Sequence, residues 1–333
     1  MSQNNLKIGI IGIGMVGTPL KRYFEEVRGH RRGKDLFLYD IDSKKGCLDN
    51  INQAHVIFVC VPTPRNPDGS ANVAAIGSAL RTIKPPKIVV IKSTVPPGTT
   101  ESLQKAHQKL FLLFNPEFLT ESRSWEDMIN PDRQIVGHTA RSQNHTSAVL
   151  GLLPTAFFSS PGTLGTYTFM RLNATEAELG KYAGNIFGAL KVTYANVLKD
   201  FCDTLEMANS KKGVRAPVRY EHVRAMLAHD RRIGDAWLNV DYHNYRGYGG
   251  YCFTKDTDAL IANGEKTLGT LSQRTPEHKR LSKGLAFLKA MREYNETLLA
   301  TQGLTSEDVS VHDHEWIQKK VKGQRSNVKS WIL

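Results

Sequence analysis

The chain has 333 residues, 40% of them hydrophobic and 23% charged, and its 44 basic and 32 acidic residues give a formal net charge of +12. This length and apolar content exclude a disordered chain and predict two domains, and no apolar run reaches the ~18 residues needed to span a bilayer. The positive charge favours an anionic small molecule, whereas the scattered basic residues argue against a nucleic-acid surface.

The four cysteines, at positions 47, 60, 202 and 252, have neither paired spacing nor the spacing of metal ligands. The N-terminus lacks the basic and apolar regions of a secretory leader. We therefore expect a cytoplasmic protein with reduced thiols and no metal. The sequence His-Asp-His at 312–314 is typical of a solvated loop.

The first half of the chain alternates short apolar runs with helical patterns. Buried strands are expected at 6–14, 36–40, 55–61, 87–93, 110–115 and 134–139, and helices at 17–27 and 72–83. This alternation predicts an α/β fold, a Rossmann-like doubly wound parallel sheet over residues 1–172.

From Ala174 onward the pattern becomes helical. A long helix is expected to about Met207, with further helices near 218–229 and 278–300. We therefore expect an all-helical central domain over residues 173–303, followed by a basic C-terminal tail over 304–333. The long helix is a natural surface for a homodimer.

A glycine-rich turn follows the first expected strand. Its sequence is Gly12-x-Gly14-x-x-Gly17, and Asp40 ends the second strand 23 residues after the last glycine. After a strand and before a helix, this pattern is typical of a dinucleotide site in which the acid binds the adenosine ribose. A carboxylate there favours NAD over NADP, although Lys44 and Lys45 nearby weaken the preference, and a turn needed only for packing is the alternative. The expected cofactor-binding residues of this region are Gly12, Ile13, Gly14, Met15, Val16, Gly17, Asp40 and Lys45.

Seven further motifs follow in a fixed order. They are VPTP (61–64), STVPPGTT (93–100), NPEFLTE (115–121), NPDRQIVG (130–137), ELGKYAGN (178–185), DRRIG (230–234) and GYGGYCFTKD (247–256). Together they resemble the UDP-glucose/GDP-mannose dehydrogenase family over roughly residues 6 to 300. The resemblance implies that two molecules of NAD oxidise the primary alcohol of a nucleotide sugar to a carboxylate without release of the aldehyde.

The resemblance implies that Cys252 is the nucleophile, which would form a thiohemiacetal and then a thioester. Cys252 stands just before an apparent helix and close in sequence to Lys255, and both features favour the thiolate. A buried core cysteine is the alternative interpretation.

The resemblance also implies roles for several polar residues. Lys181 and Asn185, which share a helix face at i and i+4, would stabilise an oxyanion and hold a water molecule. Asp256 and Thr94 would position the water or the transferred proton, and Glu117 would be the acid or base of hydrolysis. The remaining implied cofactor contacts are Val61, Pro62, Thr63, Ser93, Thr94, Glu121 and Lys255, and the implied substrate contacts are Glu117, Phe118, Leu119, Lys181, Asn185, Arg232, Tyr248 and Gly249. In the family, the arginine that matches Arg232 often reaches the substrate from the partner subunit.

The end of the chain departs from the family pattern. Only 33 residues follow the helix expected at 285–300, too few for the family's third domain, which binds the nucleotide. We therefore expect weak affinity for a nucleotide sugar unless a second chain supplies that domain. Three interpretations stay open: a two-step sugar dehydrogenase, a non-catalytic NAD-binding remnant or sensor, and a single-step two-domain hydroxyacid dehydrogenase.

Overall fold

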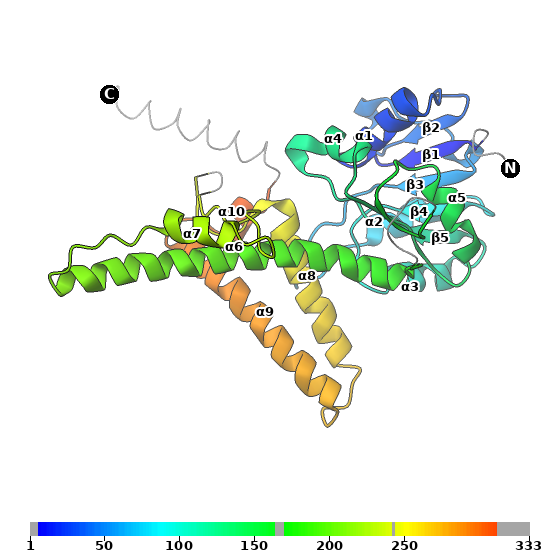
Figure 1. The fold of residues 1–333 in the computed structure, drawn as a ribbon. Helices are drawn as coiled ribbons and strands as arrows, with labels where there is room; N and C mark the ends of the chain where they lie inside the picture. The colour runs from blue at the N-terminus through cyan, green and yellow to red at the C-terminus, as the bar shows by residue number, and fades with distance from the viewer. Residues whose placement is uncertain (1–5, 164–169, 242–243, 312–333) are drawn as a thin grey trace, which may run out of the picture. The chain divides into compact units, whose positions relative to one another are not determined.

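The computed structural model describes residues 6–163, 170–241 and 244–311 (Figure 1). The chain divides into two compact units, Met1–Tyr182 and Ala183–Leu333, and the division falls within the long helix α6 (Ala174–Lys211). The predicted boundary lies at 172–173, just before this helix. Of the predicted tail, only residues up to 311 are described.

The N-terminal unit is built on a six-stranded sheet in the order β2-β1-β3-β4-β5-β7. Its first five strands are parallel and in register, so that Ile8 of β1 lies opposite Leu36 of β2 and Val56 of β3. The strands are β1 (Ile8–Ile11), β2 (Leu36–Tyr39), β3 (Val56–Val59), β4 (Ile88–Ile91), β5 (Phe111–Phe114) and β7 (Gly137–His138), which is antiparallel to β5. Strands β6 (Arg133–Ile135) and β8 (Phe158–Ser160) form a separate parallel pair. The predicted α/β fold class is confirmed.

Helices cover both faces of this sheet. One face packs against α1 (Gly17–Arg22), the π-helical turn Tyr23–Val27, α4 (Ser124–Ile129) and α5 (Thr146–Leu150). The other face packs against α2 (Ala74–Thr82), α3 (Thr99–Ala106) and the first turns of α6. Successive side chains of a strand point to opposite faces, so Ile10 lies in the first core and Ile11 in the second. Both cores are needed because a parallel sheet is apolar on both faces.

The direction of winding changes between β1 and β3. The chain passes from β1 to β2 on one side and then returns past β1 to β3 on the other. Two 3₁₀ turns, Ser43–Lys45 and Ile51–Gln53, make up the short connection from β2 to β3. Ligands of open α/β sheets bind beyond the carboxyl ends of the strands at such a point, which is where the glycine-rich turn lies.

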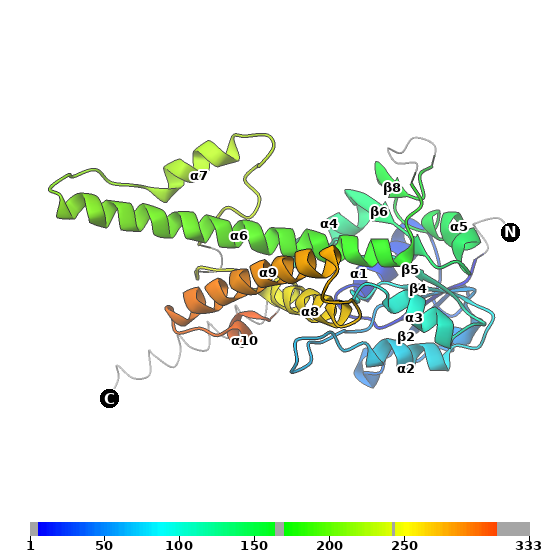
Figure 2. The ribbon, with the colours of Figure 1, turned by 90° about the horizontal axis from the view of Figure 1, so that it is seen from below.

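The C-terminal unit is helical. It contains most of α6 together with α7 (Tyr220–Ala228), α8 (Gly250–Leu268), α9 (Pro276–Ala300) and the short α10 (Ser306–Val309). Helices α8 and α9 run side by side as an antiparallel pair (Figures 1 and 2). Gly264 lets them approach closely, because a Cβ atom there would lie 2.6 Å from Leu285. No helix within the described residues is long and apolar enough to cross a membrane.

Glu178 joins the first turns of α6 to the N-terminus of α3. Its carboxylate is fully buried and accepts hydrogen bonds from Gly98 N (2.6 Å), Thr100 N (2.8 Å) and Thr100 Oγ1 (2.6 Å). These bonds satisfy backbone N–H groups that have no partner within their own helix. Burial raises the pKa of Glu178 to about 7, an effect larger than the lowering by these hydrogen bonds.

We predict that Glu178 makes the free energy of unfolding fall as the pH rises from about 4.5 to about 7. In this range the folded protein keeps a proton that the unfolded chain has lost, so that raising the pH favours unfolding, by about 3 kcal/mol at ~1.36 kcal/mol per unit. Urea unfolding at about pH 5 and about pH 7.5 should show this dependence in the wild type and not in Glu178→Gln. Glu176→Gln, at an exposed position of the same helix, is the control. An equal dependence in all three proteins would contradict the prediction.

Candidate functional site

The predicted site residues fall in both compact units. In the N-terminal unit, the three glycines of the turn have different reasons to be glycine. Gly12 has φ +90°, and a Cβ there would lie 2.7 Å from the Cys60 carbonyl oxygen; at Gly17 it would lie 1.9 Å from the Gly12 oxygen. Packing therefore explains these two glycines. A Cβ at Gly14 would meet nothing within 4 Å, so packing gives no reason for a glycine there.

Asp40 is bonded to the glycine-rich turn. Its buried carboxylate accepts hydrogen bonds from Ile13 N (2.7 Å), Asp42 N (2.9 Å) and Lys45 Nζ (2.9 Å). Burial alone would raise the pKa of Asp40, but these hydrogen bonds outweigh it and hold the pKa below its ordinary value. The structure therefore brings Asp40, Ile13 and Lys45 together as predicted, with the carboxylate ionised and partly neutralised by Lys45.

The turns after β3 and β4 are tied to each other. Ser93 Oγ donates to the Val61 carbonyl (2.6 Å), and Thr63 Oγ1 donates to the Thr94 carbonyl (2.8 Å). Pro62 lies between the two contact points on the β3 side. The predicted cofactor contacts of this region thus line the same edge of the sheet as the glycine-rich turn.

Glu117 and Lys181 form a buried ion pair. Nζ of Lys181 lies 3.1 Å from Oε1 of Glu117, and the side chains are 5% and 10% exposed. Oε2 of Glu117 accepts the Leu119 N–H (2.8 Å), and Lys181 Nζ lies 5.4 Å from the centre of the Phe118 ring. Burial would raise the pKa of Glu117, but attraction to Lys181 and the Leu119 hydrogen bond hold it below the ordinary value. Glu117 is therefore a carboxylate able to accept a proton.

In the C-terminal unit, Asp256 gathers two of the other predicted residues. Its carboxylate is 1% exposed and accepts from Asn185 Nδ2 (2.6 Å) and Lys255 Nζ (2.5 Å). Lys255 therefore forms an ion pair with Asp256. Lys181 and Asn185 lie one turn apart on the continuous helix α6, as the i,i+4 spacing predicted.

Cys252 differs from the other cysteines in exposure. It is partly exposed and lies in the first turn of α8, whereas the other three are buried. Burial raises the pKa of the Cys60 thiol to about 12, so that thiol stays protonated. Both glycines before Cys252 are required by the local structure. Gly250 has φ +74°, and a Cβ at Gly249 would lie 2.1 Å from the Tyr245 hydroxyl oxygen.

Two other predicted substrate contacts have partners within the C-terminal unit. Tyr248 is buried, its N–H donates to Asn295 Oδ1 (2.7 Å), and its carbonyl accepts from Asn295 Nδ2 (3.0 Å). Arg232 is 88% exposed and pairs with Asp230 (2.6 Å). Glu121, predicted as a cofactor contact, begins the 3₁₀ turn Glu121–Arg123.

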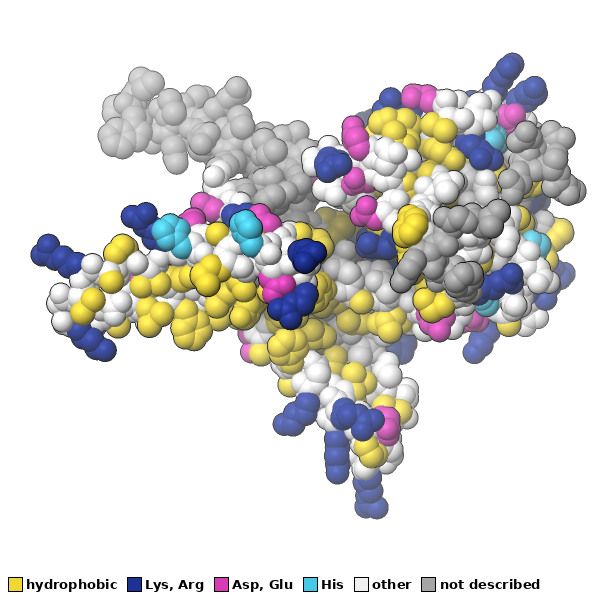
Figure 3. All heavy atoms as spheres, in the orientation of Figure 1, with side chains coloured by type: hydrophobic (Ala, Val, Ile, Leu, Met, Phe, Trp, Pro, Cys, Tyr) yellow, Lys and Arg dark blue, Asp and Glu magenta, His cyan; other side chains and the backbone are white. Residues whose placement is uncertain are grey.

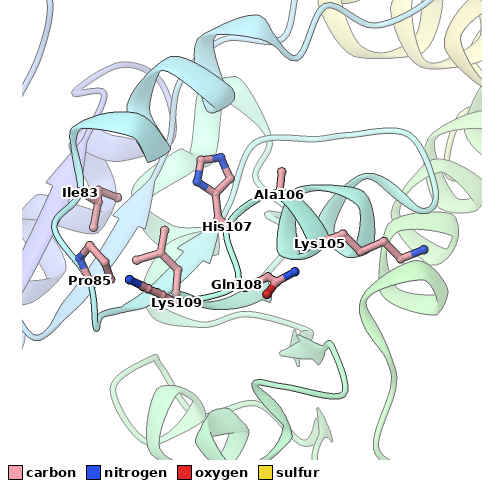
Figure 4. A pocket seen from close by; sticks show the side chains of 8 residues that line it. Ile83, Pro85, Lys105, Ala106, His107, Gln108 and Lys109 are labelled. Atoms are coloured by element: carbon pink, nitrogen blue, oxygen red, sulfur yellow. The ribbon is translucent and has the colours of Figure 1, made fainter.

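One surface hollow lies apart from the predicted site residues. It has a volume of about 380 Å³ and is lined by residues 105–110 together with Ile83 and Pro85 (Figure 4). No predicted site residue lines it. Among the described residues there is also no group of three or more His, Cys, Asp or Glu side chains that could hold a metal.

Two buried charged residues were missed by the sequence analysis. Lys92 directly follows β4 and is 3% exposed, and its Nζ donates to Asn115 Oδ1 (2.6 Å). Glu178 is the other. Lys92 could have been noticed as a charged residue at the end of an apolar strand. Glu178 gave no signal beyond its place at the start of the motif ELGKYAGN.

Two family models match the chain. Residues 44–150 match the UDP-glucose/GDP-mannose dehydrogenase family, NAD binding domain, and residues 175–273 match the central domain of the same family. Together these ranges cover more than half of the chain.

Curated relatives and a solved structure similar to this chain are named as UDP-glucose dehydrogenases. Putative UDP-glucose 6-dehydrogenase YtcA of Bacillus subtilis is 29% identical over 88% of this chain and 72% of its own length. UDP-glucose 6-dehydrogenase YwqF of the same organism is 32% identical over 77% of this chain and 61% of its own length. The structure of a UDP-glucose dehydrogenase from Pyrobaculum islandicum, 26% identical, superposes with a TM-score of 0.61 and covers 88% of this chain and 68% of that one. The chain therefore corresponds to part of each relative.

We predict that the protein binds NAD at least tenfold more tightly than NADP, because Asp40 repels a 2′-phosphate; tenfold is ~1.4 kcal/mol. Lys45 opposes this preference by neutralising Asp40. Lys45→Ala should therefore widen the ratio of affinities, and Lys44→Ala, which removes the same charge one residue away, should change it less. Calorimetric titration of both cofactors measures the ratio. Equal affinities in the wild type would contradict the prediction.

Proposed function

Since this chain belongs to the UDP-glucose/GDP-mannose dehydrogenase family, we propose that it oxidises the primary alcohol of a nucleotide sugar to a carboxylate. Family membership confirms the resemblance predicted from the seven motifs, and the family's NAD binding domain confirms the predicted cofactor. When bound, NAD supplies the nicotinamide ring that accepts a hydride. The space beside Gly14 and the carboxylate of Asp40 would hold its pyrophosphate and its adenosine ribose.

The proposed reaction has two oxidations joined by a covalent step at Cys252. Loss of a proton and a hydride converts the alcohol to an aldehyde. The Cys252 thiolate then adds to the aldehyde carbon and gives a thiohemiacetal, which loses a second hydride and a proton to become a thioester. Water cleaves the thioester, releasing the carboxylate and the thiol. One alcohol and one water thus yield one carboxylate, two transferred hydrides and three protons.

The charged residues support these steps in different ways. Lys181 carries a buried positive charge that can stabilise the oxygen of the alkoxide and of the tetrahedral adducts. Glu117 is held as a carboxylate and can take a proton from the hydrolytic water. Asp256 accepts a hydrogen bond from Asn185 and thereby fixes the orientation of its amide. The N-terminus of α8 favours an anionic sulfur at Cys252.

The exposure of Cys252 carries this proposal. It is the one cysteine of the chain that is not buried, and it stands in the first turn of α8, four residues before Asp256. A hydroxyacid dehydrogenase that acts once per turnover would not need such a thiol. A non-catalytic NAD-binding remnant or sensor would need neither the thiol nor the buried Glu117–Lys181 pair.

The substrate class follows from the relatives and from charge. Several relatives are named for UDP-glucose, and the net charge of +12 suits a pyrophosphate-bearing substrate. A screen of UDP-sugars, GDP-mannose, sugar phosphates and free sugars for NADH formation tests this class. NADH formation from free sugars alone would contradict it.

We predict that the wild type forms two NADH per substrate and that Cys252→Ser forms at most one. A serine hydroxyl is not ionised near neutral pH and adds poorly to an aldehyde, so that the second oxidation stops while NAD binding is retained. Cys202→Ser changes a buried cysteine and should keep the ratio of two. Counting NADH against consumed substrate separates the interpretations, since a single-step enzyme gives one and a remnant gives none. Two NADH from Cys252→Ser would rule out the covalent mechanism.

We also propose a homodimer formed through α6. Large apolar side chains are exposed on this helix at Phe187 (59%), Tyr194 (54%), Phe201 (62%) and Leu205 (52%). Their spacing of seven and four residues places them on one face of the helix. Apolar side chains lie along this part of the molecule in the space-filling view (Figure 3). A self-complementary apolar stripe of this kind suits a second copy of the chain.

We predict a dimer at concentrations on the order of tens of micromolar. Phe201→Asp would place a charge in the apolar interface and should shift the protein towards the monomer. Val27→Asp, at a 56% exposed apolar position of the N-terminal unit, should leave the dimer intact. Sedimentation velocity measures both. A monomeric wild type, or loss of the dimer in both variants, would contradict the prediction.

A further inference from the structure

Lys92 is a buried lysine whose hydrogen-bond partner is an uncharged amide. Its side chain directly follows β4, is almost fully buried, and donates to the Asn115 amide oxygen at 2.6 Å. Among the described residues, no carboxylate lies within ion-pair distance of its Nζ. Burial of a lysine without a paired carboxylate is costly, so a charge at this position calls for a functional explanation.

The position of the Lys92 head group is fixed by a hydrogen-bond network. Asn115 Nδ2 donates to Gln134 Oε1 (2.8 Å) and to the Ile135 carbonyl (2.6 Å). Both hydrogens of the Asn115 amide are thus used, and its Oδ1 is left to accept from Lys92. A flipped amide would lose both bonds, so the amine of Lys92 is held in one place.

Lys92 is bonded to Asn115, two residues before Glu117 in the turn after β5. Three titratable groups act on it electrostatically, which are Cys60, Glu117 and Lys181. The Cys60 thiol is neutral, because burial raises its pKa to about 12. Glu117 is therefore the only negative charge among them, and two lysines face one carboxylate. The pKa of Lys92 is lowered from its ordinary value, chiefly by burial; Cys60 and Glu117 act to raise it and Lys181 to lower it further.

We propose that Lys92 is a positioning residue of the Glu117–Lys181 pair and that its charge keeps Glu117 ionised. The need arises from the chemistry. When Lys181 turns its charge to a substrate oxyanion, it stabilises Glu117 less, and a buried carboxylate without compensation takes up a proton. Lys92, held by Asn115, would keep its positive charge in place while Lys181 turns to the substrate. The inference rests on the proposed function in one respect, the assignment of Glu117 as the base of hydrolysis.

The test compares Lys92→Gln with a matched variant on the same strand. Glutamine can still donate to Asn115 Oδ1 but carries no charge. Lys87 precedes β4 at its other end and likewise donates to a neutral oxygen, the Ala54 carbonyl (2.6 Å), so Lys87→Gln is the control. The ¹³C carboxyl signal of labelled glutamate, assigned by its loss in Glu117→Gln, reports the protonation of Glu117 directly. We expect its titration midpoint to move to higher pH in Lys92→Gln and to stay in place in Lys87→Gln. An unchanged midpoint in Lys92→Gln, or an equal shift in both variants, would overturn the proposal.

A second measurement needs no substitution at position 92. In wild-type protein with ¹⁵N-labelled lysine, the Lys92 Nζ signal should be that of an ammonium throughout the pH range in which Glu117 titrates. A neutral amine in that range would overturn the proposal even if Lys92→Gln did not fold.

The pH profile of turnover separates this inference from the proposed function. With an active enzyme, the acid limb of NADH formation should move to higher pH in Lys92→Gln, together with the carboxyl midpoint. A moved midpoint without NADH from any nucleotide sugar supports the role of Lys92 and counts against the proposed function. NADH formation with an unmoved midpoint counts against Lys92 alone.

Discussion

The buried ion pair between Glu117 and Lys181 is the interaction on which the proposed chemistry depends. Two charges taken out of water are stable only if each is compensated and held in good geometry. Here Lys181 comes from α6 and Glu117 from the turn after β5, so the pair requires both elements to be fixed. Glu178, one turn earlier on α6, supplies that fixing through its three hydrogen bonds at the start of α3.

The glycines of the turns before α1 and α8 differ in what surrounds them. Gly12 and Gly17 are required by close backbone contacts, and Gly249 by the Tyr245 hydroxyl. Gly14 has no such neighbour, which leaves room for the proposed pyrophosphate. Close packing therefore gives a reason for glycine at Gly12 and Gly17 and none at Gly14.

Much of the fold could be predicted from the sequence, because each parallel strand is a short apolar run and most of them are closed by a polar residue or glycine. The placement of Lys181 and Asn185 one turn apart on a single helix was also predictable from their spacing. Burial of individual polar residues was not. In the sequence Lys92 is only the end of a strand, whereas in the structure it donates to the amide of Asn115. The resemblance implies that Tyr248 contacts substrate, and nothing in the sequence shows that Asn295 binds its backbone. Such partners lie far away in sequence and give no local signal.

The unbroken course of α6 limits which changes of length the chain can tolerate. Each residue of an α-helix advances the side-chain direction by about 100°, so one inserted or deleted residue turns everything downstream to a different face. An insertion between Lys181 and Asn185 would swing the amide away from Asp256 and, at the same time, rotate the whole row from Phe187 to Leu205 relative to Lys181. A substitution in this helix changes one side chain, whereas an insertion or deletion changes the direction of the catalytic groups and of the proposed dimer face together. Relatives that keep this chemistry should therefore keep the length of this segment even where its sequence has diverged.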